Sequence, residues 1–493
     1  MVYESLSEDA VIPRVSSFSD SESLREHLER LGVAAELPLD EVALSVKSGS
    51  PMSRPIELFG KKLTNRWCIH PMEGWDGELD GRASSWVHRR WRRFGESGAS
   101  LIWGGEAYAV LPEARANPRQ LCWAPENEES TRQLYQTLLE SHRKRYGDAG
   151  VESLVVGLQL THSGRFCKPM EGKGLQPKIA YHHPILDAKF GIDPTDDSVV
   201  VRDDDLKRLV DQYVVVAKMA KRIGFDFVDL KACHGYLGHE LLSAYDRPGR
   251  YGGDFTGRTR FLCELVAAVR SAEPELGIGV RLSLFDTLPF QPDPVTTRRD
   301  ESGRILRFGR GIPSRFSAPY PGFGCDRNDP MRLDLTEPIR LLEMLGNRYG
   351  VRLFNLTAGS PYYNPHISRP AFVPPSDGYR PPEDPLVGVA RQIGAVRRVK
   401  EAVPDAILVG TGYTYLQEYL PHVAQNVVRR GWVDFVGYGR MVLCYPDVAD
   451  DLLQGRELDR KRICRTFSEC TTAPRRGLIS GCYPLDPDYS QLT

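Results

Sequence analysis

Short apolar runs recur along the chain, and stretches with helical periodicity lie between them. The runs predict eight strands at residues 66–72, 100–106, 153–160, 225–230, 277–283, 351–357, 406–412 and 433–439. They show little strict alternation of apolar and polar residues, as expected for parallel strands that are covered on both faces. Eight strand-then-helix units predict an α/β fold, a TIM (β/α)8 barrel.

The segments between the strands place apolar residues at helical spacing. Three such faces are Leu206, Leu209, Tyr213, Val216 and Ala220, then Phe261, Leu265 and Val269, then Val389, Ile393, Val396 and Val399. The basic run HRRWRR at 88–93 belongs to a fourth pattern, in which Val87, Trp91 and Phe94 share one face. We interpret this run as the solvated side of an amphipathic helix, so it does not indicate a nucleic-acid site.

The barrel pattern divides the chain into three parts. Residues 1–50 form an N-terminal extension with one expected helix in SESLREHLERLG, residues 51–460 form the barrel, and residues 461–493 form a tail that contains cysteines. The insertion at 284–332 and the proline-rich loop at 360–384 are long for connections in a barrel. Both follow predicted strands, on the face where barrel enzymes keep their active sites, so we expect them to form a lid or substrate wall.

Composition and charge narrow the classes of partner. The 493 residues are 41% hydrophobic and 26% charged, which is typical of a globular protein. With 64 basic and 65 acidic residues, the chain has no overall field that would attract nucleic acid or an anionic membrane. No apolar run is long enough to span a membrane, and the polar start is not a signal peptide. We expect a cytoplasmic protein with ten reduced cysteines, a small-molecule substrate and, as an option, a homo-oligomeric state.

Glycines and a cation follow the last two predicted strands. Gly410 and Gly412 end the seventh strand, and Gly439 with Arg440 ends the eighth. Barrels of this type commonly bind a phosphate at this position, where backbone N–H groups and a cation meet the anion. The alternative is tight-turn glycines with a surface arginine. No GxGxxG motif opens a strand–helix–strand unit, so a phosphate here would belong to a mononucleotide.

Three ionisable residues stand where the fourth predicted strand ends. In VDLKACHGYLGHELLSAYDRPGRYGG, residues 228–253, Lys231, His234 and Tyr236 lie within six positions. Groups of this kind are costly to bury together without a function. The structural alternatives are a core tyrosine with a satisfied hydroxyl and a lysine that pairs with a nearby carboxylate.

An ordered set of motifs resembles the Old Yellow Enzyme family of FMN-dependent NADH:flavin oxidoreductases over roughly residues 52–455. The motifs are GLQLTHSGR, HGYLGHELLS with RPGRYGG and GRTRF, GVRLS, and GTG with GRMVL. The resemblance implies FMN as cofactor and NAD(P)H as electron donor. Carried over residue by residue, it implies that the cofactor is bound by Pro71, Met72, Ala107, Gln159, Arg281, Gly410, Gly412, Gly439 and Arg440.

The same resemblance implies an ene-reductase reaction. Hydride passes from NAD(P)H through flavin N5 to an activated C=C bond, and Tyr236 supplies the proton. Lys231 and His234 occupy the place of the family's usual His/His or His/Asn pair, so we expect them to hold the substrate oxygen. Glu73 stands where the family commonly has Cys or Thr. We hypothesise that Glu73 and Lys231 are coupled, with a salt bridge that offsets the carboxylate charge near the flavin.

The tail resembles a remnant of the cluster segment in the dienoyl-CoA-reductase branch of that family. That segment has the spacing C-x2-C-x3-C-x11-C, and only the last interval survives here, between Cys470 and Cys482. The close pair is missing, so we expect no iron–sulfur cluster and no metal. The branch's nucleotide-binding domain is also missing, so NAD(P)H is expected to reduce FMN directly. Two alternatives stay open, namely flavin-dependent oxidation of an amine or a partly reduced ring, and a redox-neutral flavin-binding barrel.

Overall fold

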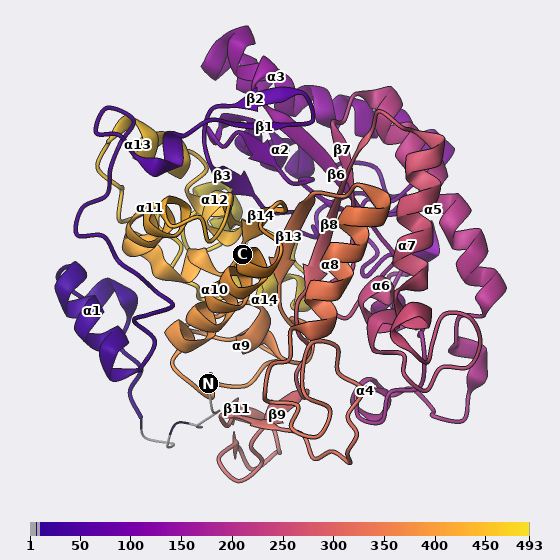
Figure 1. The fold of residues 1–493 in the computed structure, drawn as a ribbon. Coiled ribbons are helices and arrows are strands. Elements are labelled where there is room, and N and C mark those ends of the chain that lie inside the picture. Colours follow the sequence, from indigo (N-terminus) through magenta and orange to yellow (C-terminus); the bar gives the residue numbers. More distant parts are fainter. Residues whose placement is uncertain (1–5, 7–9, 493) are drawn as a thin grey trace.

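The predicted strands close into a parallel barrel. The computed structural model describes residue 6 and residues 10–492. The strands lie in the order β4-β3-β15-β14-β13-β8-β7-β6, and pairing of β4 with β6 closes the ring at the centre of Figure 1. They are β3 (Trp67–Ile69), β4 (Leu101–Ile102), β6 (Val155–Thr161), β7 (Phe227–Leu230), β8 (Gly277–Ser283), β13 (Leu353–Thr357), β14 (Ile407–Gly410) and β15 (Phe435–Tyr438). All eight predicted strands and the TIM barrel are therefore confirmed.

The second predicted strand, residues 100–106, is shorter than expected and is followed by a break. After β4 the chain turns at Gly104 and Gly105, which both have positive φ, and a separate strand β5 (Ala107–Ala109) then pairs with the end of β6. A Cβ at Gly105 would lie 2.6 Å from the Trp91 ring. Only glycine fits this turn, because both the backbone angle and the packing exclude a side chain.

Helices surround the barrel and bury the predicted apolar faces. The long covering helices are α2 (Ser85–Glu96), α3 (Glu128–Glu152), α5 (Asp203–Ile223), α7 (Phe255–Ala272), α8 (Thr336–Tyr349), α10 (Pro385–Ala402) and α11 (Leu420–Arg429). Shorter ones are α4 (Leu186–Phe190), α6 (Leu237–Glu240), α9 (Pro365–Ser368), α12 (Arg440–Cys444) and α13 (Val448–Gln454). The faces predicted for α5, α7 and α10 are buried. Asp254 and Asp384 cap α7 and α10 by accepting backbone N–H groups of the first turn.

The apolar core has two layers. A large cluster fills the space between strands and helices, and a smaller one, which includes Trp103 and Phe227, fills the interior of the barrel. The hairpin β1 (Ile56–Leu58) and β2 (Lys61–Leu63) contributes Leu58 and Leu63 to the inner cluster. Packing within the barrel therefore leaves polar side chains to gather beyond the carboxyl ends of the strands.

The interpretation of the basic run 88–93 was wrong for three of its arginines. Val87, Trp91 and Phe94 of α2 are buried as predicted, but Arg90 is buried too and pairs with Asp76 and Glu106. Arg89 and Arg93 both donate to Asp486 of the tail. Hydrophobic spacing located the helix, but the partners of its charges come from distant parts of the chain.

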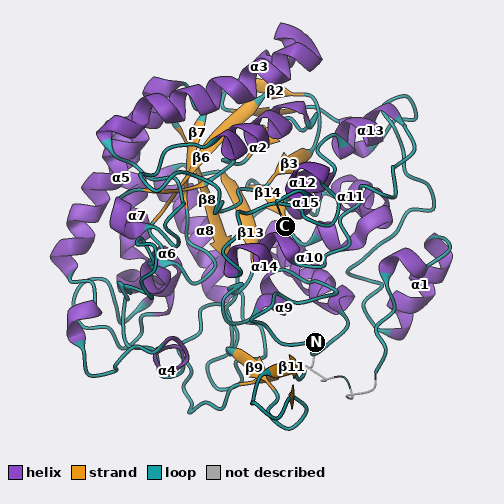
Figure 2. Cartoon of the chain, turned by 180° about the vertical axis from the view of Figure 1, so that it is seen from behind, coloured by secondary structure: helices purple, strands orange, loops and turns teal. Residues whose placement is uncertain are grey.

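The segments outside the barrel pack against it. Leu24 and Leu28 of α1 (Ser21–Arg30) belong to the large core, and α14 (Glu469–Arg475) and α15 (Pro487–Ser490) of the tail lie near the centre of Figure 2. The insertion 284–332 forms two small hairpins at the lower edge of Figure 1, β9 (Phe290–Pro292) with β12 (Gly311–Pro313), and β10 (Arg298–Arg299) with β11 (Ile305–Arg307).

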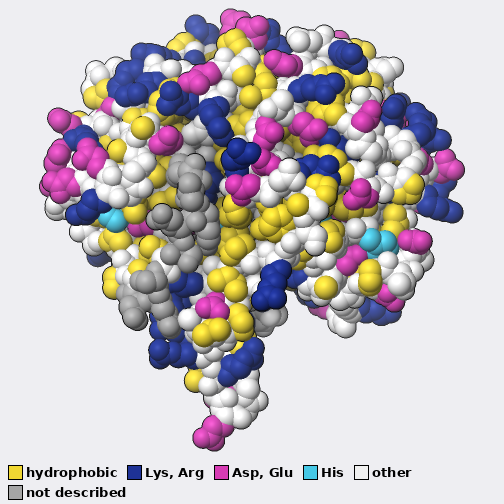
Figure 3. Space-filling view, turned by 60° about the horizontal axis from the view of Figure 1, so that its bottom comes forward, with side chains coloured by type: hydrophobic (Ala, Val, Ile, Leu, Met, Phe, Trp, Pro, Cys, Tyr) yellow, Lys and Arg dark blue, Asp and Glu magenta, His cyan; other side chains and the backbone are white. Residues whose placement is uncertain are grey.

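The surface matches the balanced composition. In the face shown in Figure 3, basic and acidic side chains are mixed and neither sign forms a continuous field. Across the part of the chain that the structure describes, no helix is long and apolar enough to cross a membrane.

Candidate active site

A cavity of about 280 Å³ opens at the carboxyl ends of the barrel strands. It brings together most of the residues singled out in the sequence, from segments more than 300 positions apart. Those that line it are Pro71, Met72, Glu73, Gln159, Lys231, His234, Tyr236, Arg281, Gly412, Gly439 and Arg440. Ala107 and Gly410 do not line it; they are buried in β5 and at the end of β14.

Gln159 is fixed by a carboxylate that the sequence analysis missed. Its side-chain amide donates to Asp229 over 2.5 Å, and Trp103 and the backbone N–H of Arg281 donate to the same carboxylate. Burial raises the pKa of Asp229 to about 6 despite these three bonds. Since the Gln159 amide nitrogen is engaged, its carbonyl oxygen is left to accept a hydrogen bond from a ligand.

Arg281 is a buried cation that forms no salt bridge among the described residues. One of its terminal nitrogens donates to the backbone oxygen of Pro71 over 3.3 Å, and its Nε has no partner in the described structure. Nearby, Asn355 bonds Nδ1 of His70. Burial, followed by the charge of Arg281, lowers the pKa of His70 well below its ordinary value, so this imidazole is neutral.

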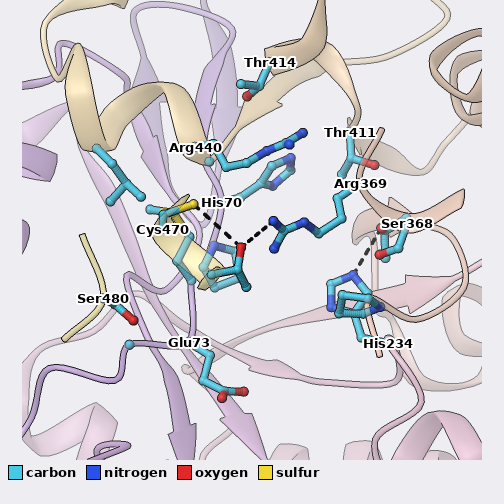
Figure 4. A pocket seen from close by; sticks show the side chains of 18 of the residues that line it. His70, Glu73, His234, Ser368, Arg369, Thr411, Thr414, Arg440, Cys470 and Ser480 are labelled. Atoms are coloured by element: carbon cyan, nitrogen blue, oxygen red, sulfur yellow. Dashed lines mark hydrogen bonds between the residues drawn. The ribbon is translucent and has the colours of Figure 1, made fainter. Parts of the chain in front are cut away.

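Two guanidinium groups face the cavity near the last strands without a carboxylate partner among the described residues. Arg440 donates to the backbone oxygen of Pro370, and Arg369 donates to the hydroxyl of Thr471 over 2.5 Å. Figure 4 shows both guanidinium groups and a dashed line for the bond of Arg369. Burial and the charge of Arg440 lower the pKa of Arg369 to about 10. An anion between two half-buried cations of this kind would stabilise both, so this end of the cavity has the charge that an anion needs.

Tyr236 lies at the centre of a hydrogen-bonded group. Its hydroxyl donates to the carboxylate of Glu73 and lies 3.0 Å from the hydroxyl of Tyr362. Asn117 donates to the other oxygen of Glu73 over 3.1 Å. Burial, and then the charge of Glu73, raise the pKa of Tyr236 well above its ordinary value. The phenol therefore keeps its proton at neutral pH.

Lys231 does not form the salt bridge with Glu73 that we hypothesised. Its Nζ instead lies 3.6 Å from the centre of the Tyr236 ring, and no described carboxylate is within salt-bridge distance of it. Burial lowers the pKa of Lys231, while the charge of Glu73 acts in the opposite direction. Tyr236 contacts both residues, so the salt bridge of the hypothesis was wrong and the coupling itself stays a prediction.

His234 is held in a strained backbone conformation. Its φ is 65°, which is unusual for a residue other than glycine. Its N–H donates to Ser283 over 3.1 Å, its carbonyl accepts from Ser360 over 2.7 Å, and its ring Nε2 lies 3.3 Å from the hydroxyl of Thr357. Burial, followed by the charges of Arg281 and Lys231, lowers its pKa well below the ordinary value, so the imidazole is neutral.

The expected wall comes from one of the two long loops and from the tail. Pro361, Tyr362, Ser368, Arg369 and Pro375 of the loop 360–384 line the cavity. No residue of the insertion 284–332 is among the lining residues within the described chain, so that expectation was wrong. The tail contributes Cys470, Thr471, Arg475, Ser480 and Gly481. No sequence signal indicated these five, because nothing local shows that the tail folds back over the barrel.

Comparison with known proteins shows which family the chain matches in sequence and which solved structures share its fold. The model of the family described as NADH:flavin oxidoreductase / NADH oxidase matches residues 51–297. The chain is 27% identical over 287 residues to an NADPH dehydrogenase of Geobacillus sp. (strain WCH70), which covers 55% of this chain and 76% of that protein.

Two solved structures share the fold at low identity. A structure of 2-naphthoyl-CoA reductase with 2-naphthoyl-CoA has a TM-score of 0.62 at 16% identity, over 90% of this chain and 57% of that one. Morphinone reductase has a TM-score of 0.53 at 20% identity, over 83% of this chain and 91% of that one. The chain therefore spans a little over half the length of the first structure and most of the second.

Proposed function

The chain belongs to the NADH:flavin oxidoreductase / NADH oxidase family and is an FMN-dependent NAD(P)H oxidoreductase, and from that premise we propose that it reduces an activated carbon–carbon double bond. The observation that carries the proposal is one cavity that combines an anion site, the Gln159–Arg281 pair and the buried phenol of Tyr236. An ene-reductase needs a place for the cofactor and a proton donor in the same space.

The residues of the cavity fit FMN. Nε of Arg281, Nε of Arg369 and Nη1 of Arg440 are buried and have no partner in the described structure. Unpaired buried N–H groups of a cation are costly, and a phosphate and an electron-rich ring edge would pair with them. When bound, FMN supplies the transfer of hydride from a nicotinamide to the double bond.

We assign the residues around this group as follows. Arg369 and Arg440, with Gly412 and Gly439, hold the phosphate. Gln159 and Arg281 bind the polar edge of the ring, and Pro71 and Met72 pack against it. Ala107 and Gly410 would act only by supporting the site, because both are buried and neither lines the cavity.

Tyr236 is the proton donor in this proposal. Tyr236 lines the cavity, its hydroxyl contacts the lining residues Glu73 and Tyr362, and its high pKa keeps it protonated until a stronger base forms beside it. Lys231 lies against the ring and stabilises the phenolate that remains after the proton leaves. The hydroxyl of Tyr362, 3.0 Å away, supplies a route by which the proton is replaced.

Lys231 and His234 are placed to hold the electron-withdrawing oxygen of the substrate. Both line the cavity next to Tyr236, and Lys231 offers three donors on a flexible stem. The charges of Lys231 and Arg281 make this part of the cavity a poor site for a cationic amine. The charges thus favour a conjugated carbonyl or acid over an amine as substrate.

An anaerobic absorbance titration tests the proposal. NADPH or NADH should bleach the oxidised-flavin bands, and one class among conjugated enones, enoic acids and enoyl thioesters should restore them. The Tyr236→Phe variant should bleach normally and recover at least 100-fold more slowly, within the usual size of a general-acid contribution. The proposal fails if reduced protein is never reoxidised by an alkene, or if Tyr236→Phe recovers at the wild-type rate.

A further inference from the structure

Tyr236 is almost completely closed off from solvent. Only 2% of its surface is exposed, and its hydroxyl has two partners in the described structure, the carboxylate of Glu73 and the hydroxyl of Tyr362. A phenol that gives a proton to the substrate in each cycle has to receive another one before the next cycle begins. The groups in contact with the hydroxyl are therefore the ones through which water can return that proton.

Glu73 is the only carboxylate among the described residues that line the large cavity. It is half-buried, so water reaches it more readily than it reaches Tyr236. No lysine, arginine or histidine of the described chain lies within salt-bridge distance of it. Since an ion pair would hold the carboxylate in its charged form, the absence of one leaves Glu73 able to take up a proton.

A buried amide fixes the orientation of Glu73. The side-chain nitrogen of Asn117 donates to one carboxylate oxygen of Glu73 over 3.1 Å and to the backbone oxygen of Gly74 over 3.2 Å. Its side-chain oxygen accepts the backbone N–H of Arg119 over 2.9 Å, so a reversed amide would lose these bonds. Asn117 is thus a positioning residue that leaves the second oxygen of Glu73 for the hydroxyl of Tyr236.

The other groups beside the phenol are poorer sources of a proton. The ammonium group of Lys231 lies over the centre of the ring and not at the hydroxyl, and the low pKa of buried His234 makes it neutral. Burial, and then the charge of Glu73, raise the pKa of Tyr362, so this phenol can pass a proton on only when a stronger acid supplies it. A carboxyl group is such an acid, and proton transfer from it to a phenolate is downhill.

We propose that Glu73 is the catalytic residue that returns a proton to Tyr236 after each turnover, an inference that rests on the proposed role of Tyr236 as proton donor. Once the phenol has given its proton away, the phenolate and the carboxylate face each other as two negative charges, and such a pair binds a proton strongly. A proton from water joins the carboxylate. The carboxyl O–H bond then breaks as a new O–H bond forms on the Tyr236 oxygen. Glu73 is again a carboxylate, no electron has moved, and one proton has been taken from water.

The first test measures proton exchange at Tyr236 in the absence of any alkene. Flavin-loaded protein with carbon-13 at Cζ of its tyrosines is dissolved in equal volumes of H2O and D2O. A hydroxyl that exchanges slowly gives two Cζ signals in the NMR spectrum, one for O–H and one for O–D, whereas fast exchange gives one averaged signal. The signal of Tyr236 is the one that disappears in Tyr236→Phe.

The expected spectra differ between two glutamate variants. Tyr236 should give one averaged signal in the wild type and two signals in Glu73→Gln, because an amide cannot supply the proton. Imidazole, added as a small diffusible acid, should merge the two signals again, which it would not do if the variant were only structurally altered. The control Glu113→Gln changes an exposed glutamate outside the cavity lining and should match the wild type. Two signals in the wild type, or one in Glu73→Gln without imidazole, would overturn the proposal.

The second test compares the first turnover with the later ones by rapid mixing with an alkene and excess NAD(P)H. In Glu73→Gln, Tyr236 starts protonated, so the later cycles should be about 100-fold slower than the first, the low end of a general-acid contribution. Asn117→Ala keeps the carboxyl group but not its orientation, so it should show a smaller lag that imidazole relieves. Equal first and later rates in Glu73→Gln would contradict the relay. Protein that no alkene reoxidises would instead refute the proposed function, and the exchange test would still decide the role of Glu73.

Discussion

Replacement of Lys231 by methionine isolates what its ammonium group contributes to proton transfer. The Nζ atom lies 3.6 Å from the centre of the Tyr236 ring. While Tyr236 is a neutral phenol, the interaction of the Lys231 ammonium with its ring is worth about 2 kcal/mol. Once Tyr236 is a phenolate, the two groups form an ion pair worth about 4 kcal/mol at about 4 Å and an effective dielectric constant of about 20. The difference, about 2 kcal/mol, arises only as the phenolate forms, so its loss slows proton transfer about 30-fold.

Rapid mixing in H2O and D2O measures this effect. The rate at which the alkene restores the flavin absorbance should fall about 30-fold in Lys231→Met, with a larger solvent isotope effect, because proton transfer becomes more strongly rate-limiting. Lys189→Met is the control, since Lys189 is an exposed lysine whose ammonium donates to the Phe290 carbonyl outside the cavity lining. If Lys231→Met and Lys189→Met gave the same rate and isotope effect, the role of Lys231 in stabilising the phenolate would be refuted.

Three further predictions address the cofactor site, the carboxylate and the core. Arg440→Met should weaken FMN binding about 10- to 100-fold, the usual cost of a charged hydrogen bond, and a fluorescence titration should show no such loss in the exposed control Arg456→Met. Glu73→Gln should raise the flavin reduction potential, measured by dye-coupled anaerobic titration, because it removes a negative charge beside the cavity; an unchanged potential would contradict the placement of Glu73. Burial raises the pKa of Asp286 to about 7 from an unfolded value of 3.8, so its contribution to stability is complete below about pH 4 and is lost as the pH rises through about 7. In Asp286→Asn, the free energy of unfolding should change less between about pH 4 and about pH 7 than it does in the wild type. The same pH dependence in both proteins would show that Asp286 titrates normally.

The sequence predicted the fold because the barrel is a local pattern repeated eight times. Each strand is a short apolar run, and each helix has a buried face that its spacing reveals, as Leu206 and Val216 do in α5. The break at Gly104 and Gly105 was missed because the steric demand of the Trp91 ring comes from another element. Positions within one element were therefore predictable, whereas contacts between elements were not.

In the candidate site, too, the residues at strand ends were predictable and the contacts between elements were not. Residues at strand ends, such as Gln159 and Arg281, were found because the strands carry them to one rim. Arg369 was missed because it lies in an irregular loop. Asp229 was missed because its partners belong to other strands, Gln159 to the adjacent β6 and Trp103 to the segment after β4. The expected ion pair of Lys231 with Glu73 does not form, because the phenol of Tyr236 lies between the ammonium and the carboxylate.

The position of the tail over the cavity sets an order of events during synthesis. Thr471, Arg475 and Ser480 line the cavity, yet the ribosome makes them after every strand of the barrel. A nascent chain can close its barrel before the wall that completes the cavity has emerged. Cofactor retention is thus a late step, and a prematurely terminated chain would hold a folded barrel with an open, leaky cavity.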